Sequence, residues 1–290
     1  MTFKPRRSCL YMPGINERAM NKARSLPADV IIFDLEDAVA PDAKAVARES
    51  VCAQLEQGGY GRRELVVRIN ALETPWGRDD LAQFSDLELA AICVPKVERP
   101  EQIKAIEQAM DELGYSKSCG IWPMAETPTG VLSQRDILAA SERIDALLMG
   151  TSDLARDLRL SRSAERSGLL HALSHCVLAA RERGIDVLDG VHLNIKDAEG
   201  FRKQCLQGRE LGFDGKTLIH PAQVEPCNEL FSPSADEVER AGRLLEAWNT
   251  ARAEGKGVAV LDGQLIEILH VEEAQRLLAV AEEIEARQVD

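Results

Sequence analysis

Two acidic side chains follow short apolar segments of the sequence in the same way. Glu126 comes directly after the run 121–125, and Asp153 comes three small residues after the run 146–149. An ionised carboxylate at the end of a buried strand is costly unless it is paired or binds a metal. Carboxylate oxygens suit a hard cation, so we predict that Glu126 and Asp153 bind Mg²⁺, or Mn²⁺ in its place. The alternative is that each carboxylate caps the helix that follows it.

Arg68 is the third chemically informative residue, because it lies inside the apolar run 64–70. A guanidinium group keeps its proton in proteins, so a buried one must meet carboxylates or a ligand anion. We predict a catalytic role for Arg68. A structural ion pair with Glu36 or Asp37 is the alternative, and the two roles are compatible.

These residues belong to a regular alternation of apolar strands and helices. The predicted strands are 8–12, 29–34, 64–70, 90–94, 120–124, 144–149, 185–188 and 215–219. Helices are predicted from Asn16 and over 41–56, 100–113, 165–184 and 197–211. About eight such units predict an α/β fold, a closed parallel TIM (β/α)8 barrel with its helices outside.

In a barrel of this kind the active site lies at the carboxyl ends of the strands. The polar residues expected there are Tyr11, Glu36, Asp37, Arg68, Lys96, Glu126, Asp153 and His220. Their convergence from most of the strands predicts a catalytic site and not isolated surface charges.

The periodicity changes after residue 231. The pattern predicts a barrel domain over 1–231 and a C-terminal helical extension over 232–290. Within the extension we expect a helix over 235–254, a brief strand over 258–261 and a final helix over 272–287.

The charge of the chain limits its partners. Its 290 residues carry a net charge of −13, which argues against binding to nucleic acid or to an anionic membrane. Residues 1–24 nevertheless hold six basic side chains and one acidic side chain, so we predict that an anionic ligand binds at this end. Seven scattered cysteines without a C-x-x-C pair, and no apolar run near the ~20 residues of a membrane span, predict a soluble cytoplasmic protein.

Three other arrangements are weaker candidates. His171 and His175 have the i, i+4 spacing of a metal-binding pair, but no glutamate accompanies them. Lys96 or Lys216 could form a Schiff base in a metal-free aldolase. No dinucleotide-binding or phosphate-binding glycine motif is present in the sequence.

Taken together, the motifs resemble those of the citrate lyase β-subunit-like family in the HpcH/HpaI aldolase superfamily, which includes malyl-CoA and citramalyl-CoA lyases. The matching segments run in the family's order over almost the whole chain. They are 7–14, 33–39, 67–70, 125–127, 150–154, 215–216 and 219–221.

The resemblance implies a Mg²⁺-dependent TIM barrel that cleaves a 3-hydroxyacyl-CoA thioester into an acyl-CoA and a 2-oxo acid such as pyruvate or glyoxylate. Glu126 and Asp153 match the metal ligands, and Arg68 matches an arginine near the thioester. Tyr11, Arg18 and Lys22 fall where relatives hold the CoA moiety, with Arg18 where many relatives carry lysine. The substrate would be a small (citra)malyl-CoA.

Further roles follow for residues around these. Main-chain N–H groups of Gly150, Thr151 and Ser152 are expected to hold the substrate carboxylate. Ile219 and His220 are expected to contact the substrate. Glu36, Asp37 and Lys96 are expected to surround Arg68 and the metal site as supporting groups.

The C-terminal extension contains one further segment that matches the family. Asp262 corresponds to an acid/base aspartate that a neighbouring subunit delivers, which implies a homo-oligomer, a trimer or hexamer. The chain departs from the family pattern here, because Gln264 replaces a lysine and no proline precedes His270.

Other functions on the same scaffold stay open. They are the citryl-acyl carrier protein lyase subunit of a citrate lyase complex, a malyl-CoA thioesterase, and a non-catalytic subunit that binds CoA esters.

Overall fold

Eight parallel strands form a closed barrel in sequence order, so the TIM-barrel prediction is confirmed. The computed structural model describes residues 4–161 and 165–288. Strand β8 pairs with β1 and closes the barrel. The strands are β1 (Ser8–Pro13), β2 (Val30–Asp34), β3 (Glu64–Arg68), β4 (Ala91–Val94), β5 (Gly120–Ala125), β6 (Ala146–Met149), β7 (Asp186–Asp189) and β8 (Gly215–Leu218).

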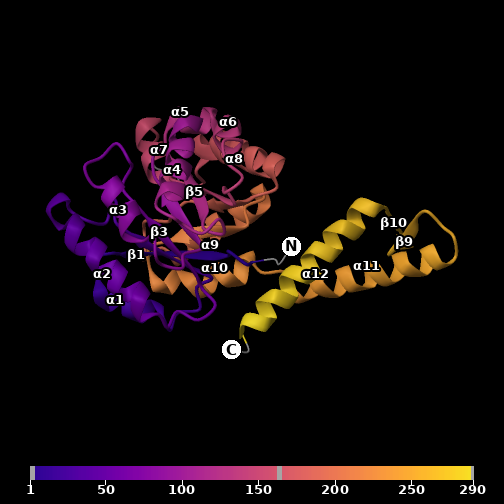
Figure 1. Ribbon diagram of the computed structural model, residues 1–290. Coiled ribbons are helices and arrows are strands. Elements are labelled where there is room, and N and C mark those ends of the chain that lie inside the picture. The colour runs from indigo at the N-terminus through magenta and orange to yellow at the C-terminus, as the bar shows by residue number, and fades with distance from the viewer. Residues whose placement is uncertain (1–3, 162–164, 289–290) are drawn as a thin grey trace. The chain divides into compact units, whose positions relative to one another are not determined.

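Helices surround these strands (Figure 1). They are α1 (Glu17–Ala23), α2 (Lys44–Gln57), α3 (Gly77–Gln83), α4 (Pro100–Glu112), α5 (Pro128–Leu132), α6 (Gln134–Leu138), α7 (Thr151–Asp157), α8 (Leu170–Arg183), α9 (Ala198–Leu211) and α10 (Val224–Phe231). The helix expected over 165–184 begins later, because a 3₁₀ turn, η2 (Ser167–Leu169), precedes α8. The sequence did not predict α3 as a helix.

The period-two alternation of strand side chains separates two cores. Residues such as Val30, Ile32, Val66 and Trp122 form a cluster inside the barrel. Their chain neighbours, such as Ile31, belong to the larger cluster between strands and helices. The last inward positions of the strands therefore place their side chains at the carboxyl end of the barrel interior.

The amino end of the barrel is closed by ion pairs. Arg6 donates to Glu64 at 2.7 Å and to Asp145 at 2.6 Å, and Arg7 donates to Asp29 at 2.8 Å. These acids lie at or just before the first residues of their strands, which is the end away from Glu126 and Asp153. The prediction that the basic residues of 1–24 jointly attract an anion is thus wrong for Arg6 and Arg7, which are buried in structural pairs.

Residues 232–288, with residues 4–5, form a second compact unit. It consists of α11 (Ala235–Ala253), the antiparallel strands β9 (Ala259–Leu261) and β10 (Gln264–Ile266), and α12 (Ile268–Gln288). Figure 1 shows α11 and α12 side by side, with the hairpin where they connect. The sequence missed β10, and α12 begins four residues before the predicted start at residue 272. None of the helices in the described ranges is long and apolar enough to cross a membrane.

The hairpin turn consists of Asp262 and Gly263, which both have positive φ, 51° and 78°. Two such residues between paired strands make the type I′ turn that matches the twist of a β-hairpin, and Asp-Gly is a favoured sequence for it. This turn brings Gln264 opposite Leu261 in the ladder.

Candidate active site

A cavity of about 350 Å³ opens at the carboxyl ends of the barrel strands. Most of the predicted barrel-site residues line it. The lining consists of Tyr11, Pro13, Asp34, Asp37, Ala38, Arg68, Met124, Glu126, Met149, Gly150, Thr151, Ser152, Asp153, Val191, Leu193, Thr217 and Ile219.

Arg68, the last residue of β3, is held from several sides. Its Nε and Nη2 atoms donate to the two carboxylate oxygens of Asp34 at 2.7 and 2.6 Å. Its Nη1 atom lies 3.0 Å from a Glu36 oxygen. The guanidinium carbon also lies 4.8 Å from the centre of the Tyr11 ring. Burial opposes the charge, but Asp34 and its neighbours outweigh burial and hold the pKa of Arg68 well above its usual value.

Asp34 is a charged residue of the site that the sequence did not predict. It stands opposite Arg68 in the register of β2 and β3, and it is 2% exposed. A signal for it existed, because Asp34 has the same parity along its strand as the inward residues Val30 and Ile32. The structural pairing expected between Arg68 and Glu36 is present, while Asp37 lies farther away, at 3.6 Å.

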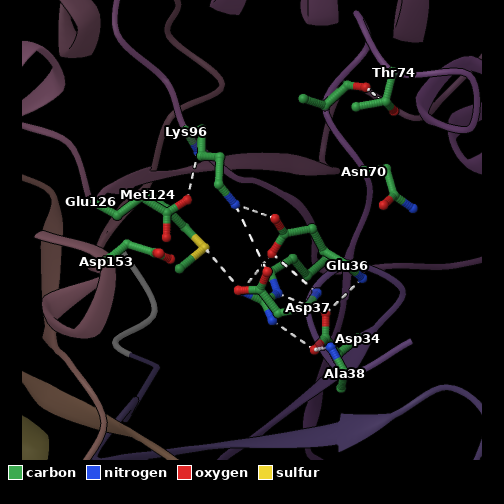
Figure 2. Close-up of polar contacts among 12 residues, drawn as sticks. Asp34, Glu36, Asp37, Ala38, Asn70, Thr74, Lys96, Met124, Glu126 and Asp153 are labelled. Carbon is green, nitrogen blue, oxygen red and sulfur yellow. Dashed lines mark hydrogen bonds and ion pairs between the residues drawn. The ribbon is translucent and has the colours of Figure 1, made fainter. Parts of the chain in front are cut away.

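Lys96 connects the arginine to the predicted metal ligands. Its ammonium group pairs with Glu36, and its main-chain N–H donates to Glu126 at 2.7 Å (Figure 2). Lys96 adopts a left-handed backbone conformation with φ of 52°. This conformation allows the side chain of Lys96 to pair with Glu36 while its main-chain N–H donates to Glu126.

Glu126 is 1% exposed, and burial raises its pKa to about 7. It does not cap helix α5. The cap is Thr127, whose hydroxyl accepts from the N–H of Gly130 at 3.0 Å. The capping alternative is therefore wrong for Glu126. A buried carboxylate with a raised pKa is stabilised in its charged form by a cation beside it.

Asp153 lies in the first turn of α7 and pairs with the exposed Arg156 at 2.5 Å. Figure 2 shows Glu126 and Asp153 pointing into the same region. Gly150 fits closely against Glu126, because a Cβ at Gly150 would lie 2.2 Å from the Glu126 Cβ and 2.5 Å from Oε2. A substituted residue at position 150 would thus displace this carboxylate.

The expectation that all three amides of Gly150, Thr151 and Ser152 face a substrate carboxylate is wrong for Gly150. Its N–H donates to the Ala125 carbonyl at 3.0 Å, which continues the ladder between β5 and β6. Thr151 and Ser152 begin α7, where main-chain N–H groups lack partners within the helix.

The donor set fits a Mg²⁺ ion. Two carboxylates, Glu126 and Asp153, line the cavity together, and acidic groups around it outnumber Arg68 and Lys96. No cluster of three or more His, Cys, Asp or Glu side chains within 4–161 and 165–288 is placed to hold a metal. Mg²⁺ commonly takes only one or two protein carboxylates and keeps water or substrate oxygens as its other ligands.

The remaining predicted site residues lie outside the cavity lining. Arg18 and Lys22 are exposed on α1. His220 caps the 3₁₀ turn η3 (Pro221–Gln223) by accepting from the N–H of Ala222. Asp262 belongs to the other compact unit, where it pairs with Arg243 at 3.2 Å.

The Schiff-base alternative finds no support at either lysine, because the Lys96 ammonium group pairs with Glu36. Lys216 is fully buried and donates to Asp189 at 2.7 Å, and Asp189 also pairs with Arg166. His171 and His175 stack with ring centres 6.2 Å apart on α8, and they form no larger ligand cluster in the described part of the chain.

Comparison with known proteins confirms the resemblance read from the motifs. The HpcH/HpaI aldolase/citrate lyase family matches residues 7–221. A (3S)-malyl-CoA thioesterase of Cereibacter sphaeroides is 46% identical over 282 residues, which cover 97% of this chain and 96% of the relative. Citrate lyase subunit beta of Escherichia coli is 35% identical over 286 residues, covering 96% of this chain and 94% of the relative.

Solved structures give the same result. CitE from Mycobacterium tuberculosis, in complex with magnesium, acetoacetate and coenzyme A, matches with a TM-score of 0.77 and 28% identity over 96% of this chain and 98% of that chain. The citrate lyase beta subunit of M. tuberculosis complexed with oxaloacetate and magnesium has a TM-score of 0.67 and 29% identity over 79% of this chain and 98% of that chain.

Proposed function

Because the chain belongs to the HpcH/HpaI aldolase/citrate lyase family, we propose that it is a Mg²⁺-dependent enzyme that cleaves the C2–C3 bond of a malyl-CoA-type thioester. One observation carries this proposal. A buried guanidinium, Arg68, and a pair of carboxylates, Glu126 and Asp153, line one cavity. The cavity can therefore stabilise negative charge at one end of a substrate and hold a cation for the other end.

The charge balance supports a cation at Glu126 and Asp153. A malyl-CoA-type substrate is an anion, and a cavity with surplus carboxylates repels anions. Relatives of this fold are solved with magnesium together with acetoacetate and coenzyme A, or with oxaloacetate. When bound, Mg²⁺ supplies a Lewis acid for the oxygens of the 2-oxo acid half of the substrate.

The chain's own groups perform the remaining steps. The C3 hydroxyl loses its proton, the C2–C3 bond breaks as the C3 carbonyl forms, and the electron pair moves onto the thioester as an enolate. Arg68 stabilises this developing charge, and Asp34 and Glu36 fix the guanidinium in place beforehand. The main-chain N–H groups of Thr151 and Ser152 at the start of α7 orient the substrate carboxylate. A proton then adds to C2 and gives the acyl-CoA.

Asp262 is proposed as the group that moves these protons, delivered from a neighbouring subunit. The hairpin that carries it exposes apolar side chains, with Val260 64% and Leu265 53% exposed. Exposed apolar side chains close together are typical of surfaces that another chain covers. This supports a homo-oligomer in which one subunit completes another's site.

The experiment is an assay of the purified chain with malyl-CoA and Mg²⁺. Bond cleavage produces acetyl-CoA and glyoxylate, which a carbonyl-trapping reagent detects, and it releases no free thiol. Absence of a 2-oxo acid from malyl-CoA and from its methylated analogues would refute the lyase proposal. Turnover without any carrier protein would also exclude an obligatory role inside a citrate lyase complex.

Thioester hydrolysis is the second candidate, and the 46% identity to a (3S)-malyl-CoA thioesterase favours it. The same Arg68 would then stabilise the oxyanion formed when water attacks the thioester carbonyl. Hydrolysis yields malate and the free thiol of CoA. The ratio of free thiol to glyoxylate, measured in one reaction mixture, therefore decides between the two reactions.

A further inference from the structure

Met124 occupies a position between the two charged parts of the cavity. It lies on β5 two residues before Glu126, and this spacing directs both side chains into the barrel. Met124 belongs to the interior cluster with Trp122 and is only 4% exposed. It also lines the cavity.

The thioether contacts the groups around Arg68. Its Sδ atom lies 3.9 Å from Nη1 of Arg68 and 3.8 Å from the hydroxyl oxygen of Tyr11. Figure 2 shows the Met124 sulfur with a dashed contact that runs away from Glu126, and all three of Met124, Glu126 and Asp153 line the cavity. Met124 thus lines the cavity on the strand that leads to Glu126, and it contacts the guanidinium of Arg68.

Other apolar lining residues lie on or after other strands, and Met149 ends β6, the strand next to β5. Leu193 follows β7, and Ile219 follows β8. Arg68 is the last residue of β3, and Glu126 directly follows β5. Strand β4 lies between these two strands. In this closed eight-stranded barrel Leu193 and Ile219 follow strands that are two and three places from β5, the strand that carries Met124.

A substrate whose thioester meets Arg68 and whose C3 oxygen faces the carboxylate pair would place C2 between these groups, on the side of the cavity where Met124 contacts Arg68. We propose that Met124 determines substrate specificity by filling the space that a substituent on C2 would need, so that the enzyme prefers thioesters with an unsubstituted C2. This inference rests on the proposed malyl-CoA-type substrate but not on which bond is broken. The methionine side chain excludes a methyl group by its volume, because its atoms are already packed against Arg68 and Tyr11.

The test compares malyl-CoA with the analogue that carries a methyl group on C2, using loss of the thioester and formation of acyl-CoA as readouts. We expect the wild-type chain to prefer malyl-CoA in kcat/KM by 10-fold or more, since one methyl group in a fitted pocket changes this ratio by roughly 10- to 200-fold. Met124→Ala should reduce the preference by about 10-fold. Because both substrates are assayed with the same protein preparation, the ratio of their kcat/KM values does not depend on the fraction of the protein that is folded.

Two control variants test whether the volume of the Met124 side chain, and no other property, sets the substrate preference. Met124→Leu keeps nearly the same volume, so it should keep the wild-type preference. Met110→Ala truncates a fully buried methionine of α4 outside the cavity, so it should lower stability without changing the ratio. An unchanged ratio in Met124→Ala, or an equal change in Met124→Leu, overturns the inference. Absence of turnover with both thioesters overturns the proposed function instead.

Discussion

Arg68 donates to both carboxylate oxygens of Asp34, its register partner on the adjacent strand β2. This bidentate pair is buried at the floor of the cavity. Two parallel N–H···O bonds fix the plane of a guanidinium, and thereby the direction of its remaining donors. Arg68 is therefore oriented before any substrate binds.

Asp34→Asn should lower kcat by on the order of 100-fold, because it removes this orientation, and should lower the free energy of unfolding by about 3 kcal/mol. Steady-state kinetics and denaturant unfolding measure the two effects. Glu64→Gln breaks the buried pair with Arg6 at the amino end of the barrel. This control should lose similar stability with an unchanged kcat. Equal kcat losses in both variants would show that Asp34 acts only through stability.

Glu126→Gln should abolish the response to Mg²⁺, because it removes one of two carboxylates available to the ion. Wild-type Tm should rise with Mg²⁺ concentration, since a ligand that binds only the folded state stabilises it. The variant should show no such rise, and Asp153→Asn should behave in the same way. Thermal unfolding with and without a chelator provides this measurement independently of activity. A normal Mg²⁺ response in both variants contradicts the metal assignment.

Gly150→Ala should impair the site, because the new Cβ would overlap the Glu126 side chain. We expect weaker Mg²⁺ stabilisation and a loss of unfolding free energy of about 1–3 kcal/mol. Gly242→Ala is the matched control. No atom lies within 4 Å of a Cβ there, and Gly242 is in helix α11, so alanine should stabilise the protein by roughly 0.5–1 kcal/mol. Wild-type metal binding in Gly150→Ala would refute the close fit.

Arg18→Ala and Lys22→Ala should raise the KM for the CoA thioester while kcat changes little. Both side chains are exposed on one face of α1, so their removal should leave Tm unchanged. The increase in KM should shrink at high salt, because salt screens charges at the surface. Arg202→Ala, which breaks an exposed pair with Glu229, is the control. If KM stays at the wild-type value in the double variant, these residues do not hold the CoA phosphates.

Asp262→Asn tests the proposed proton transfer without disturbing the turn. Asn-Gly is as well suited to a type I′ turn as Asp-Gly, so the hairpin should persist and Tm should stay constant. We expect kcat to fall by about 100- to 10,000-fold. Arg243→Gln removes the ion pairs of Arg243 with Asp262 and Glu239 and should retain most of the activity. A kcat near wild type in Asp262→Asn would exclude this residue as the proton carrier.

Much of the site was predictable because a parallel barrel gathers the ends of its strands at one rim. Glu126 and Asp153 follow apolar runs, and this local pattern was enough to place both of them at the cavity. Arg68 was predictable for a related reason, since a permanent charge inside an apolar strand demands partners. The sequence alone also indicated the barrel and the change of character after residue 231.

Pairings between distant segments were not predictable from the sequence. Only the register of β2 and β3 identifies Asp34 as the partner of Arg68. Gly150 was predicted to donate its N–H to the substrate, but this N–H donates to the Ala125 carbonyl in the ladder between β5 and β6. Arg6 and Arg7 share a cationic segment with Arg18, but they point to the opposite end of the barrel.

The sequence by itself indicated the eight strands and the acidic residues that follow two of them, because apolar runs are local properties of the chain. Only the tertiary structure decided which inward groups meet and which backbone groups are already bonded. The physical reason is that strand register and barrel closure depend on contacts between segments tens of residues apart, and a one-residue shift in register would change every such partner.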